Sequence, residues 1–403
     1  MMQSYDLAIV GGGIVGLTLA ASLTDCELSI AVIESEVPIL TDDQSVGRVS
    51  AISFATRTIL EKLNIWSEID MKRITHYNSM HVWDEGSAAK IDFDREQVGY
   101  DHLGCIVENN QIHRAVLKVI KQQANVTLYS PDQLTNVAVS DGDAWLTLKN
   151  DKALTAKLVV GADGANSWLR NKVNIPLTHW DYDHHSIVAT VKTELVHENC
   201  ARQIFTADGP LAFLPLFEEN LCSIVWSVPP EKAKQLQALS ELEFNKQLSR
   251  AFDNHLGLCS VVGDRHSFPL KMRYARDFAK HRIALIGDAA HTIHPLAGQG
   301  LNLGLLDALS LSETIIENKE ADKDIGALVN LRHFERWRKS EAAQMIASME
   351  VLKRLFEGNN SLKKGLRDLA LVIADKVMPL KSLFIKQAMG LSGELPKIIK
   401  TRH

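Results

Sequence analysis

The chain has 403 residues, of which 46% are hydrophobic and 23% charged, and its formal net charge is −5. These values are typical of a soluble globular protein, and the length predicts two domains. The negative charge and the lack of a nucleic-acid-binding motif argue against DNA- and RNA-binding proteins, so we predict no nucleic acid partner.

The cysteines are scattered singly, without the close pairs that zinc or iron–sulfur sites need. We therefore predict small buried residues in a reducing, cytoplasmic compartment rather than disulfides or metal ligands. The cysteines are Cys26, Cys105, Cys200, Cys222 and Cys259.

The uncharged run at residues 7–24 follows Asp6 and has no basic segment before it, which indicates a glycine turn rather than a signal peptide or membrane span.

The N-terminal residues predict a strand, a helix and a second strand. Residues 5–10 form a short apolar run, and residues 14–23 carry small and apolar side chains at helical spacing. Residues 29–33 are again rich in residues that favour strands. This order is that of a βαβ unit.

Three glycines occupy the turn between the first strand and the helix, where Gly11, Gly13 and Gly16 form the pattern G-x-G-x-x-G. Such glycines let backbone amides approach a pyrophosphate at the helix N-terminus. Glu34 ends the second strand, where a carboxylate can accept hydrogen bonds from ribose hydroxyls. Together these residues predict a dinucleotide site. The alternative is a turn that only lets the helix pack closely, with Glu34 as a solvated strand end.

Further along the chain, residues 80–93 and 187–229 alternate apolar and polar residues and predict a separate antiparallel sheet. The nucleotide domain is therefore expected to be interrupted by a second domain. After residue 288 the pattern becomes helical, mainly at residues 305–316 and 327–347. The segments between the two alternating stretches predict a helix, short strands and one further strand, at residues 109–123, 126–148 and 158–160.

Two more glycine-containing segments follow apolar strands. Residues 161–167 contain Asp163, which fits a ligand-binding turn or a plain turn equally well. Residues 287–291 follow a second apolar strand, and residues 294–302 then open another helix. A helix N-terminus at that point can polarise an electron-rich ring.

These three segments, in this order and spacing, resemble those of the flavoprotein aromatic hydroxylases with the para-hydroxybenzoate hydroxylase fold, over residues 5–340. Residues 48–52, 76–83 and 180–189 are similar to the ubiquinone-biosynthesis branch of that family, especially to 2-octaprenylphenol hydroxylases. Pattern and resemblance together predict an α/β protein with an α+β second domain. Its expected parts are a discontinuous, Rossmann-like FAD-binding domain (1–75, 100–180 and 275–340), an antiparallel-sheet substrate domain (76–99 and 181–274) and a helical C-terminal region (341–403).

The resemblance also implies which residues contact FAD. The three glycines of the first turn would hold the pyrophosphate, and Glu34 would hold the adenosine ribose. Asp288 would bind the ribityl or pyrophosphate side of the flavin, and Asp163 would lie near FAD and the path of the reductant. Arg48 and Gln111 match further FAD-contacting positions, although Arg48 also fits a surface arginine. The residues expected along the flavin ring are Pro295, Gly298, Gly300 and Asn302.

In this family NAD(P)H usually reduces FAD, and a flavin C4a-hydroperoxide delivers hydroxyl to an electron-rich phenol. The resemblance thus implies a monooxygenase that uses FAD, O2 and transiently bound NAD(P)H on a polyprenylated phenol. Such a protein must position the ring and exclude water, and it needs no side-chain nucleophile. The alternatives are another FAD oxidoreductase of this fold, such as a prenyl reductase or halogenase, and a FAD-holding subunit that does not turn over.

Histidines near these segments are candidates for further chemistry. His291 and His294 fit a proton relay for phenol deprotonation, or a hydrogen-bonded structural pair. His184 and His185 enter a strand on consecutive residues, whose side chains point oppositely, so we predict no metal site there. Four residues of the alternating stretch fit either a pocket for the phenol and its lipid tail or, as we favour, the core: Phe205, Phe213, Pro215 and Trp226.

The C-terminal segment is strongly basic. Residues 351–403 hold 11 lysines and arginines against 4 aspartates and glutamates, whereas the whole chain holds 44 against 49. Apolar residues recur in it at roughly helical intervals. The segment therefore fits an anionic membrane surface, a ubiquinone-biosynthesis protein complex, or a cap on its own domain with a solvated basic face. A peripheral place on the inner membrane follows from the first alternative.

Overall fold

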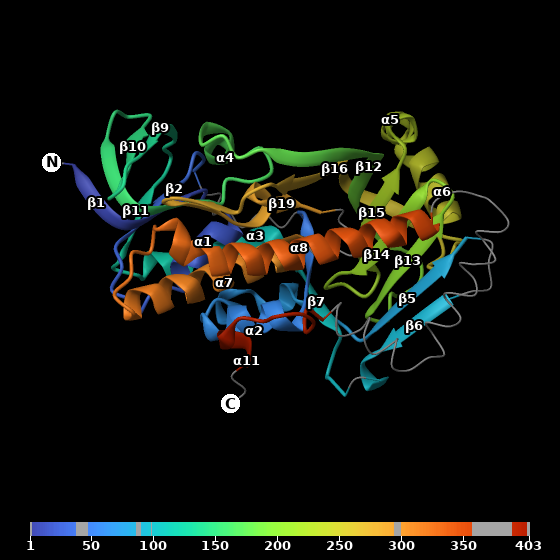
Figure 1. Ribbon diagram of the computed structural model, residues 1–403. Helices are drawn as coiled ribbons and strands as arrows, with labels where there is room; N and C mark the ends of the chain where they lie inside the picture. The colour runs from blue at the N-terminus through green and yellow to red at the C-terminus, as the bar shows by residue number, and fades with distance from the viewer. Residues whose placement is uncertain are drawn as a thin grey trace.

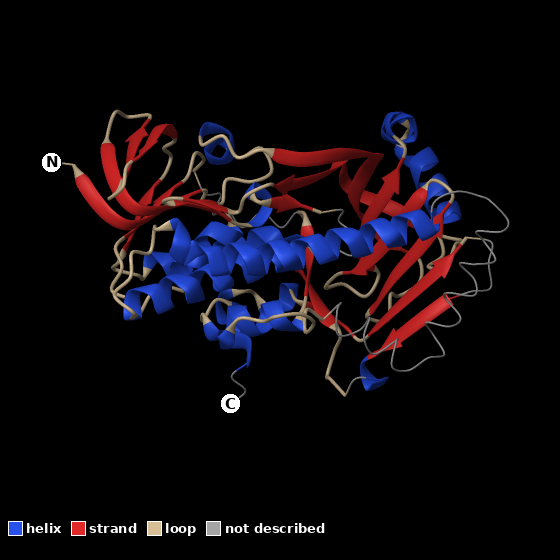
Figure 2. Cartoon of the chain, in the orientation of Figure 1, coloured by secondary structure: helices blue, strands red, loops and turns tan. Residues whose placement is uncertain are grey.

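The computed structural model describes residues 2–37, 47–85, 90–97, 99–293, 300–356 and 389–400 (Figure 1). These residues form two large sheets and one small sheet, with helices packed against them (Figure 2). The mixed α/β class that the sequence predicts is confirmed.

The first sheet has eight strands, and its centre is parallel. β1 (Gln3–Val10) pairs with β2 (Ile30–Ile33) on one side and with β11 (Ala153–Gly161) on the other. Residues 7–10 of β1 and all of β2 are buried, because helices and neighbouring strands cover this part of the sheet. The other strands are β8 (Val126–Tyr129), β9 (Leu134–Val139), β10 (Ala144–Leu148), β17 (Ala279–Lys280) and β18 (Ile283–Leu285).

Three helices pack together on one side of this sheet, as Figure 1 shows. α1 (Ile14–Ala21) is apolar on all sides and lies between the other two, α3 (Asn109–Lys121) and α7 (Gly300–Glu320). α3 is amphipathic, since its buried residues recur at helical spacing from Ile112 to Ile120. The resulting core joins the sheet to all three helices.

The second sheet also has eight strands, in the order β19-β16-β12-β15-β14-β13-β5-β6. Every pair is antiparallel except β13 and β5, which run parallel. The prediction of a purely antiparallel sheet is wrong at this pair, because β5 enters from the first part of the chain and no hairpin turn fixes its direction. The strands are β5 (Ser79–Asp84), β6 (Lys90–Asp94), β12 (Leu177–Thr193), β13 (Cys200–Thr206), β14 (Gly209–Pro215), β15 (Leu221–Val228), β16 (Cys259–Ala275) and β19 (His291–Thr292).

The two faces of the second sheet differ in what covers them. Successive side chains of a strand point to opposite faces, so Ile187, Phe213 and Ile224 share one face. They pack there with Phe244 and Phe252, from the region of helices α5 (Pro230–Ala238) and α6 (Glu241–Ala251). We call the opposite face, which carries Ser186, Val188, Leu214, Ser223, Val225 and Phe268, the cavity face.

Shared elements connect the two large sheets. β12 and β16 are 17 residues long and pair along their length, with irregularities between Asp181 and His185 and between Val188 and Thr190. α8 (Leu328–Phe356) begins on the core of the first sheet, and its Ile346 packs against Tyr182 and Met272 of the second. The boundary predicted at residue 340 therefore falls inside a continuous helix, because the apolar pattern of α8 runs through it. The other domain limits stay predictions.

Smaller elements complete the described chain. β3 (Val49–Ile52), β7 (Gly104–Glu108) and β4 (Thr75–Tyr77) form a three-stranded antiparallel sheet. All five cysteines are free thiols, of which four are buried and Cys26 is partly buried. The short helices are α2 (Phe54–Lys62), α4 (Trp168–Lys172), α11 (Lys397–Lys400), η1 (Trp66–Glu68), η2 (Met71–Arg73), η3 (Arg95–Gln97) and η4 (Gly287–Ala289).

Candidate functional site

Three turns lie side by side at one edge of the first sheet, because they follow three neighbouring parallel strands. Val10 of β1 pairs with Gly161 of β11, and Gly161 pairs with Leu285 of β18. The glycine turn, the Asp163 turn and the Asp288 turn therefore start from adjacent strand ends. Ligands of parallel α/β sheets bind at this carboxyl edge.

The glycines of the first turn have different structural roles. Gly11 has a φ of +107°, and a Cβ there would overlap the Ala162 carbonyl. A Cβ on Gly16 would overlap the Gly11 carbonyl, so Gly16 allows α1 to pack against the turn. Gly13 has open space at its Cβ position and lines a cavity. Of the three, Gly13 is the one that lines the cavity.

Glu34 lies beside this turn at the end of β2. Its Oε2 accepts a hydrogen bond from the Gly12 N–H at 2.6 Å, and its Oε1 accepts one from the Glu36 N–H at 2.9 Å. The carboxylate is therefore held in place by the backbone of the turn itself. His113 of α3, which sequence reasoning missed, contacts the Gly12 carbonyl oxygen through Nε2 at 2.8 Å.

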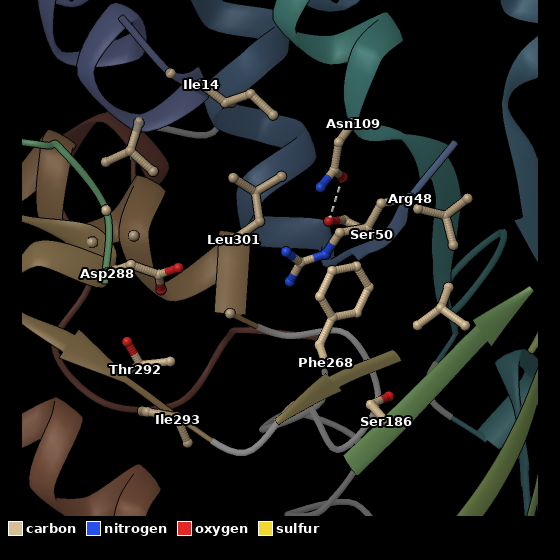
Figure 3. A pocket seen from close by; sticks show the side chains of 18 of the residues that line it. Ile14, Arg48, Ser50, Asn109, Ser186, Phe268, Asp288, Thr292, Ile293 and Leu301 are labelled. Atoms are coloured by element: carbon tan, nitrogen blue, oxygen red, sulfur yellow. Dashed lines mark hydrogen bonds between the residues drawn. The ribbon is translucent and has the colours of Figure 1, made fainter. Parts of the chain in front are cut away.

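A cavity of about 400 Å³ opens between this edge and the cavity face of the second sheet (Figure 3). Gly13, Arg48, Asp288 and Gly300 line it, so four of the predicted FAD contacts meet in one space. Lys271, which sequence reasoning missed, also lines it. The remaining wall residues include Ser50, Asn109, Ala162, Gly164, Arg273, Thr292, Ile293 and Leu301.

Asp288 is the acidic group of this cavity. Its side chain is open to the cavity but recessed in the protein, and desolvation raises the pKa of its carboxyl despite the opposing charges of His291, Arg48 and Arg273. Arg48, Lys271 and Arg273 add three cationic side chains to the lining. The cavity thus carries more positive than negative side chains, as a doubly charged diphosphate requires.

The side chain of Asp163 hydrogen-bonds the backbone a few residues further along the chain and so stabilises the second turn. Its Oδ2 accepts a hydrogen bond from the Leu169 N–H at 3.0 Å, which orders the start of α4. Its Oδ1 is buried and has no hydrogen-bond partner within the described part of the chain. Arg170 of the same helix donates to the Ala289 carbonyl at 2.9 Å and so ties this turn to the Asp288 turn.

The other predicted contacts lie behind or outside the cavity. Asn302 is buried and links α7 to the end of β3, because it donates to the Ala51 carbonyl at 2.8 Å and accepts from the Ser53 N–H at 3.1 Å. Gln111 is partly buried on α3 and does not line the cavity, whereas Asn109 does and accepts a hydrogen bond from Ser50 at 2.6 Å. The positions of His294, Pro295 and Gly298 lie outside the described residues.

His291 belongs to a buried ionic group rather than to the cavity wall. Its Nε2 lies 2.6 Å from Asp307 Oδ2, which also accepts the Gly287 N–H at 3.0 Å, and Arg338 donates to Asp307 Oδ1 at 2.7 Å. Burial raises the pKa of Asp307, but the charges of His291 and Arg338 outweigh it and hold this pKa below its usual range. An ionised aspartate only accepts hydrogen bonds, so His291 Nε2 donates. This geometry favours the structural alternative for His291.

One group of three metal-ligand types occurs among the described residues, at His76, His102 and Cys105. Arg57 hydrogen-bonds His102, and its guanidinium would repel a metal cation at this place. Burial, with the charges of His76 and Arg57, lowers the pKa of His102 to about 4. His184 and His185, for which no metal site was predicted, contact the Tyr182 carbonyl and the Ser267 hydroxyl.

The residues of the cavity fit FAD on three observations. Gly13 leaves room for a group against its backbone, the lining is cationic, and the turns after three neighbouring parallel strands open onto this one space. A sequence model for the FAD binding domain matches residues 4–328. The chain belongs to the FAD binding domain family. FAD is therefore its cofactor.

Relatives of this FAD binding domain protein match it over nearly their whole length. It is 34% identical to the 3-demethoxyubiquinol 3-hydroxylase of Escherichia coli, over 96% of this chain and 99% of the relative. It is 34% identical to the ubiquinone hydroxylase UbiL of Rhodospirillum rubrum, over 98% and 92% of the two chains. The human ubiquinone biosynthesis monooxygenase COQ6 is 31% identical, over 94% and 91%.

Solved structures share the fold. The p-nitrophenol 4-monooxygenase PnpA of Pseudomonas putida superposes with a TM-score of 0.80 at 20% identity, covering 98% of this chain and all of that one. PqsL of Pseudomonas aeruginosa gives a TM-score of 0.76 at 19% identity, covering 95% of this chain and 100% of that one.

Among the described helices of the FAD binding domain protein, none is long and apolar enough to span a bilayer.

Proposed function

We propose that this protein is a FAD-dependent monooxygenase that hydroxylates the aromatic ring of a polyprenylated phenol in ubiquinone biosynthesis. One observation carries the proposal: a single cavity has the cofactor turns on one wall and a largely apolar sheet face on the other. Phe268, Val188, Leu214 and Val225 give that face the apolar character that a prenylated ring requires. The full-length relatives named as ubiquinone hydroxylases support the same reaction.

FAD, when bound, supplies the activated oxygen that is transferred to the ring. The residues of the chain bind the cofactor and orient the substrate ring. Gly13 presents its backbone to the cofactor, and Arg48 and Arg273 offset the negative charge of the diphosphate and of the reduced flavin. The second sheet covers the cavity on the side away from these turns, and so excludes water from the ring. No side-chain nucleophile is required.

The apolar wall and the names of the relatives both support a substrate class. The sequence resembles 2-octaprenylphenol hydroxylases, and the relative from Escherichia coli is named for 3-demethoxyubiquinol. We therefore propose a prenylated phenol or quinol as the substrate class, with NADH or NADPH as a transient reductant.

The test is turnover by the purified, FAD-loaded protein. Dissolved oxygen and product mass would be followed with NADH or NADPH and a short-chain 2-prenylphenol. We expect substrate-dependent consumption of oxygen and a product heavier by one oxygen atom. Flavin reduction that yields only hydrogen peroxide, with unchanged phenol, would contradict the hydroxylase proposal. A protein that binds FAD but is never reduced would instead support the non-catalytic subunit.

We also propose that the basic C-terminal segment brings the protein to an anionic membrane surface, where a polyprenylated substrate resides. Most of this segment lies outside the described residues, so its composition alone supports the proposal. The full chain should float with vesicles that contain anionic lipid and remain unbound with neutral vesicles. Binding that does not depend on lipid charge would favour a protein complex or a domain cap.

A further inference from the structure

The cavity face of the second sheet presents an unusual aromatic side chain. Phe268 of β16 is 51% exposed, and its ring lines the cavity. Figure 3 shows its ring standing in the cavity between Arg48 and Ser186. A phenyl ring left in contact with water costs free energy that an apolar partner would recover. The ring therefore marks a place where a flat apolar group packs.

A buried hydroxyl that lacks a hydrogen-bond partner lies directly beside this ring. Ser186 of β12 pairs with Phe268 across the strands and is only 3% exposed. Its Oγ is buried and has no hydrogen-bond partner in the described part of the molecule, although the residue lines the cavity. A buried hydroxyl without a partner has lost the hydrogen bonds that it would make in water, so a ligand that supplies one is favoured. On the other side Ser186 pairs with Ser227 of β15, which makes no hydrogen bond to it, and the next residues on the same face are Val188 and Val225, which cannot supply one.

We propose that Ser186 and Phe268 together bind the hydroxylated end of the substrate ring. The ring packs on Phe268, and its oxygen hydrogen-bonds the Ser186 hydroxyl. A serine hydroxyl donates or accepts, so it holds the ring oxygen as a neutral phenol or as a phenolate. Rotation about the serine χ1, between staggered positions, turns the shielded oxygen toward the cavity. The proposal deepens the proposed function by naming the residues that select a phenol over a ring without oxygen.

A second hydroxyl offers a competing anchor. Thr292 of β19 also lines the cavity, and its Oγ1 is buried without a partner among the described residues. Figure 3 shows it below Asp288, on the cofactor side of the cavity, away from Phe268. Ser186 is favoured because it is the neighbour of Phe268 on one wall. Phe268 can then pack on the substrate ring while Ser186 hydrogen-bonds the oxygen of the same ring.

The experiment compares two ligands that differ by one oxygen, a short-chain 2-prenylphenol and the same prenylbenzene without the hydroxyl. Their dissociation constants would be measured with the FAD-loaded protein in the absence of reductant. The wild type should bind the phenol about tenfold more tightly, the size of one hydrogen bond. Ser186→Ala should bind both ligands equally, Ser186→Thr should keep the preference, and Phe268→Leu should weaken both ligands alike.

The matched control is Ser227→Ala, which removes the buried hydroxyl directly opposite Ser186 at a residue that does not itself line the cavity. It should keep the tenfold preference, and the flavin spectrum should show full FAD occupancy in every variant. An unchanged preference in Ser186→Ala, or its loss in Thr292→Val alone, would overturn the assignment.

Binding and turnover separate this assignment from the proposed function. If the wild type hydroxylates the phenol while Ser186→Ala keeps the preference, the assignment fails and the function stands. If the wild type prefers the phenol through Ser186 but produces only peroxide, the anchor stands and the hydroxylase proposal fails. A wild type that binds neither ligand contradicts both.

Discussion

The two walls of the cavity are built on different principles. The cofactor wall consists of turns after parallel strands, and its geometry depends on backbone that tolerates no side chain, as at Gly11 and Gly16. The opposite wall is one face of a sheet, and its character depends on which alternate side chains point inward, as at Ser186 and Val225. Motifs therefore reveal the first wall, whereas only strand direction and packing reveal the second.

The sharpest test of the first wall compares two glycines of one turn. Gly11→Ala places a Cβ on the Ala162 carbonyl at a φ of +107°, so we expect loss of FAD and a destabilisation of at least about 2 kcal/mol. Gly13→Ala adds its Cβ to open space and should fold normally with weaker FAD binding. Thermal unfolding and FAD titration would measure both. Equal stability of the two variants would contradict this distinction.

The buried ion group behind the Asp288 turn gives the next largest effect. Asp307→Asn leaves Arg338 without its charged partner, so we expect a loss of about 3 kcal/mol at neutral pH. The pKa of Asp307 is lowered in the folded state, so its contribution is complete above the usual aspartate pKa of about 3.9 and is lost as the pH falls below it. Denaturant unfolding should therefore show the wild type and the variant converging at acid pH. A difference that does not depend on pH would mean that packing, not charge, is responsible.

Neighbouring residues of β15 test the second wall. Ile224 is fully buried on the helix-covered face, so Ile224→Ala should cost about 3 kcal/mol and leave ligand preference unchanged. Val225 is partly buried on the cavity face, so Val225→Ala should cost about 1 kcal/mol and weaken binding of a 2-prenylphenol severalfold. Unfolding curves and ligand titrations would be compared. Similar profiles for the two variants would show that the faces are assigned wrongly.

Most of the fold could be predicted from the sequence, because local patterns determine the elements. The apolar runs and glycine turns locate β1, α1 and β2 to within two residues. The parallel pairing of β5 with β13 was not predictable in the same way, and neither was the contact of α8 with two cores, since both depend on contacts between distant segments. A helix that bridges two cores has no local feature that marks it.

The site is only partly readable from the sequence for the same reason. Bulky aromatic residues such as Phe213 and Trp226 attract attention as pocket candidates, but they belong to the core under α5 and α6, as we favoured. The cavity is lined by Leu214 and Val225, their immediate neighbours in the chain. Likewise Asn109 lines the cavity where Gln111 was expected, because two helical steps turn a side chain by about 200°. The face of a helix or strand that becomes buried depends on the elements that pack against it.

The helix α8 and the strands β12 and β16 contribute residues both to the core of the first sheet and to the cluster around Tyr182 and Met272. These elements hold the two walls of the cavity together, so the distance between the walls depends on their length and packing as well as on the lining residues. The packing of Ile346 on Tyr182 and Met272 fixes α8 against the second sheet. A substitution at a lining position such as Val225 therefore changes the shape of the cavity without changing the elements that set the distance between its walls.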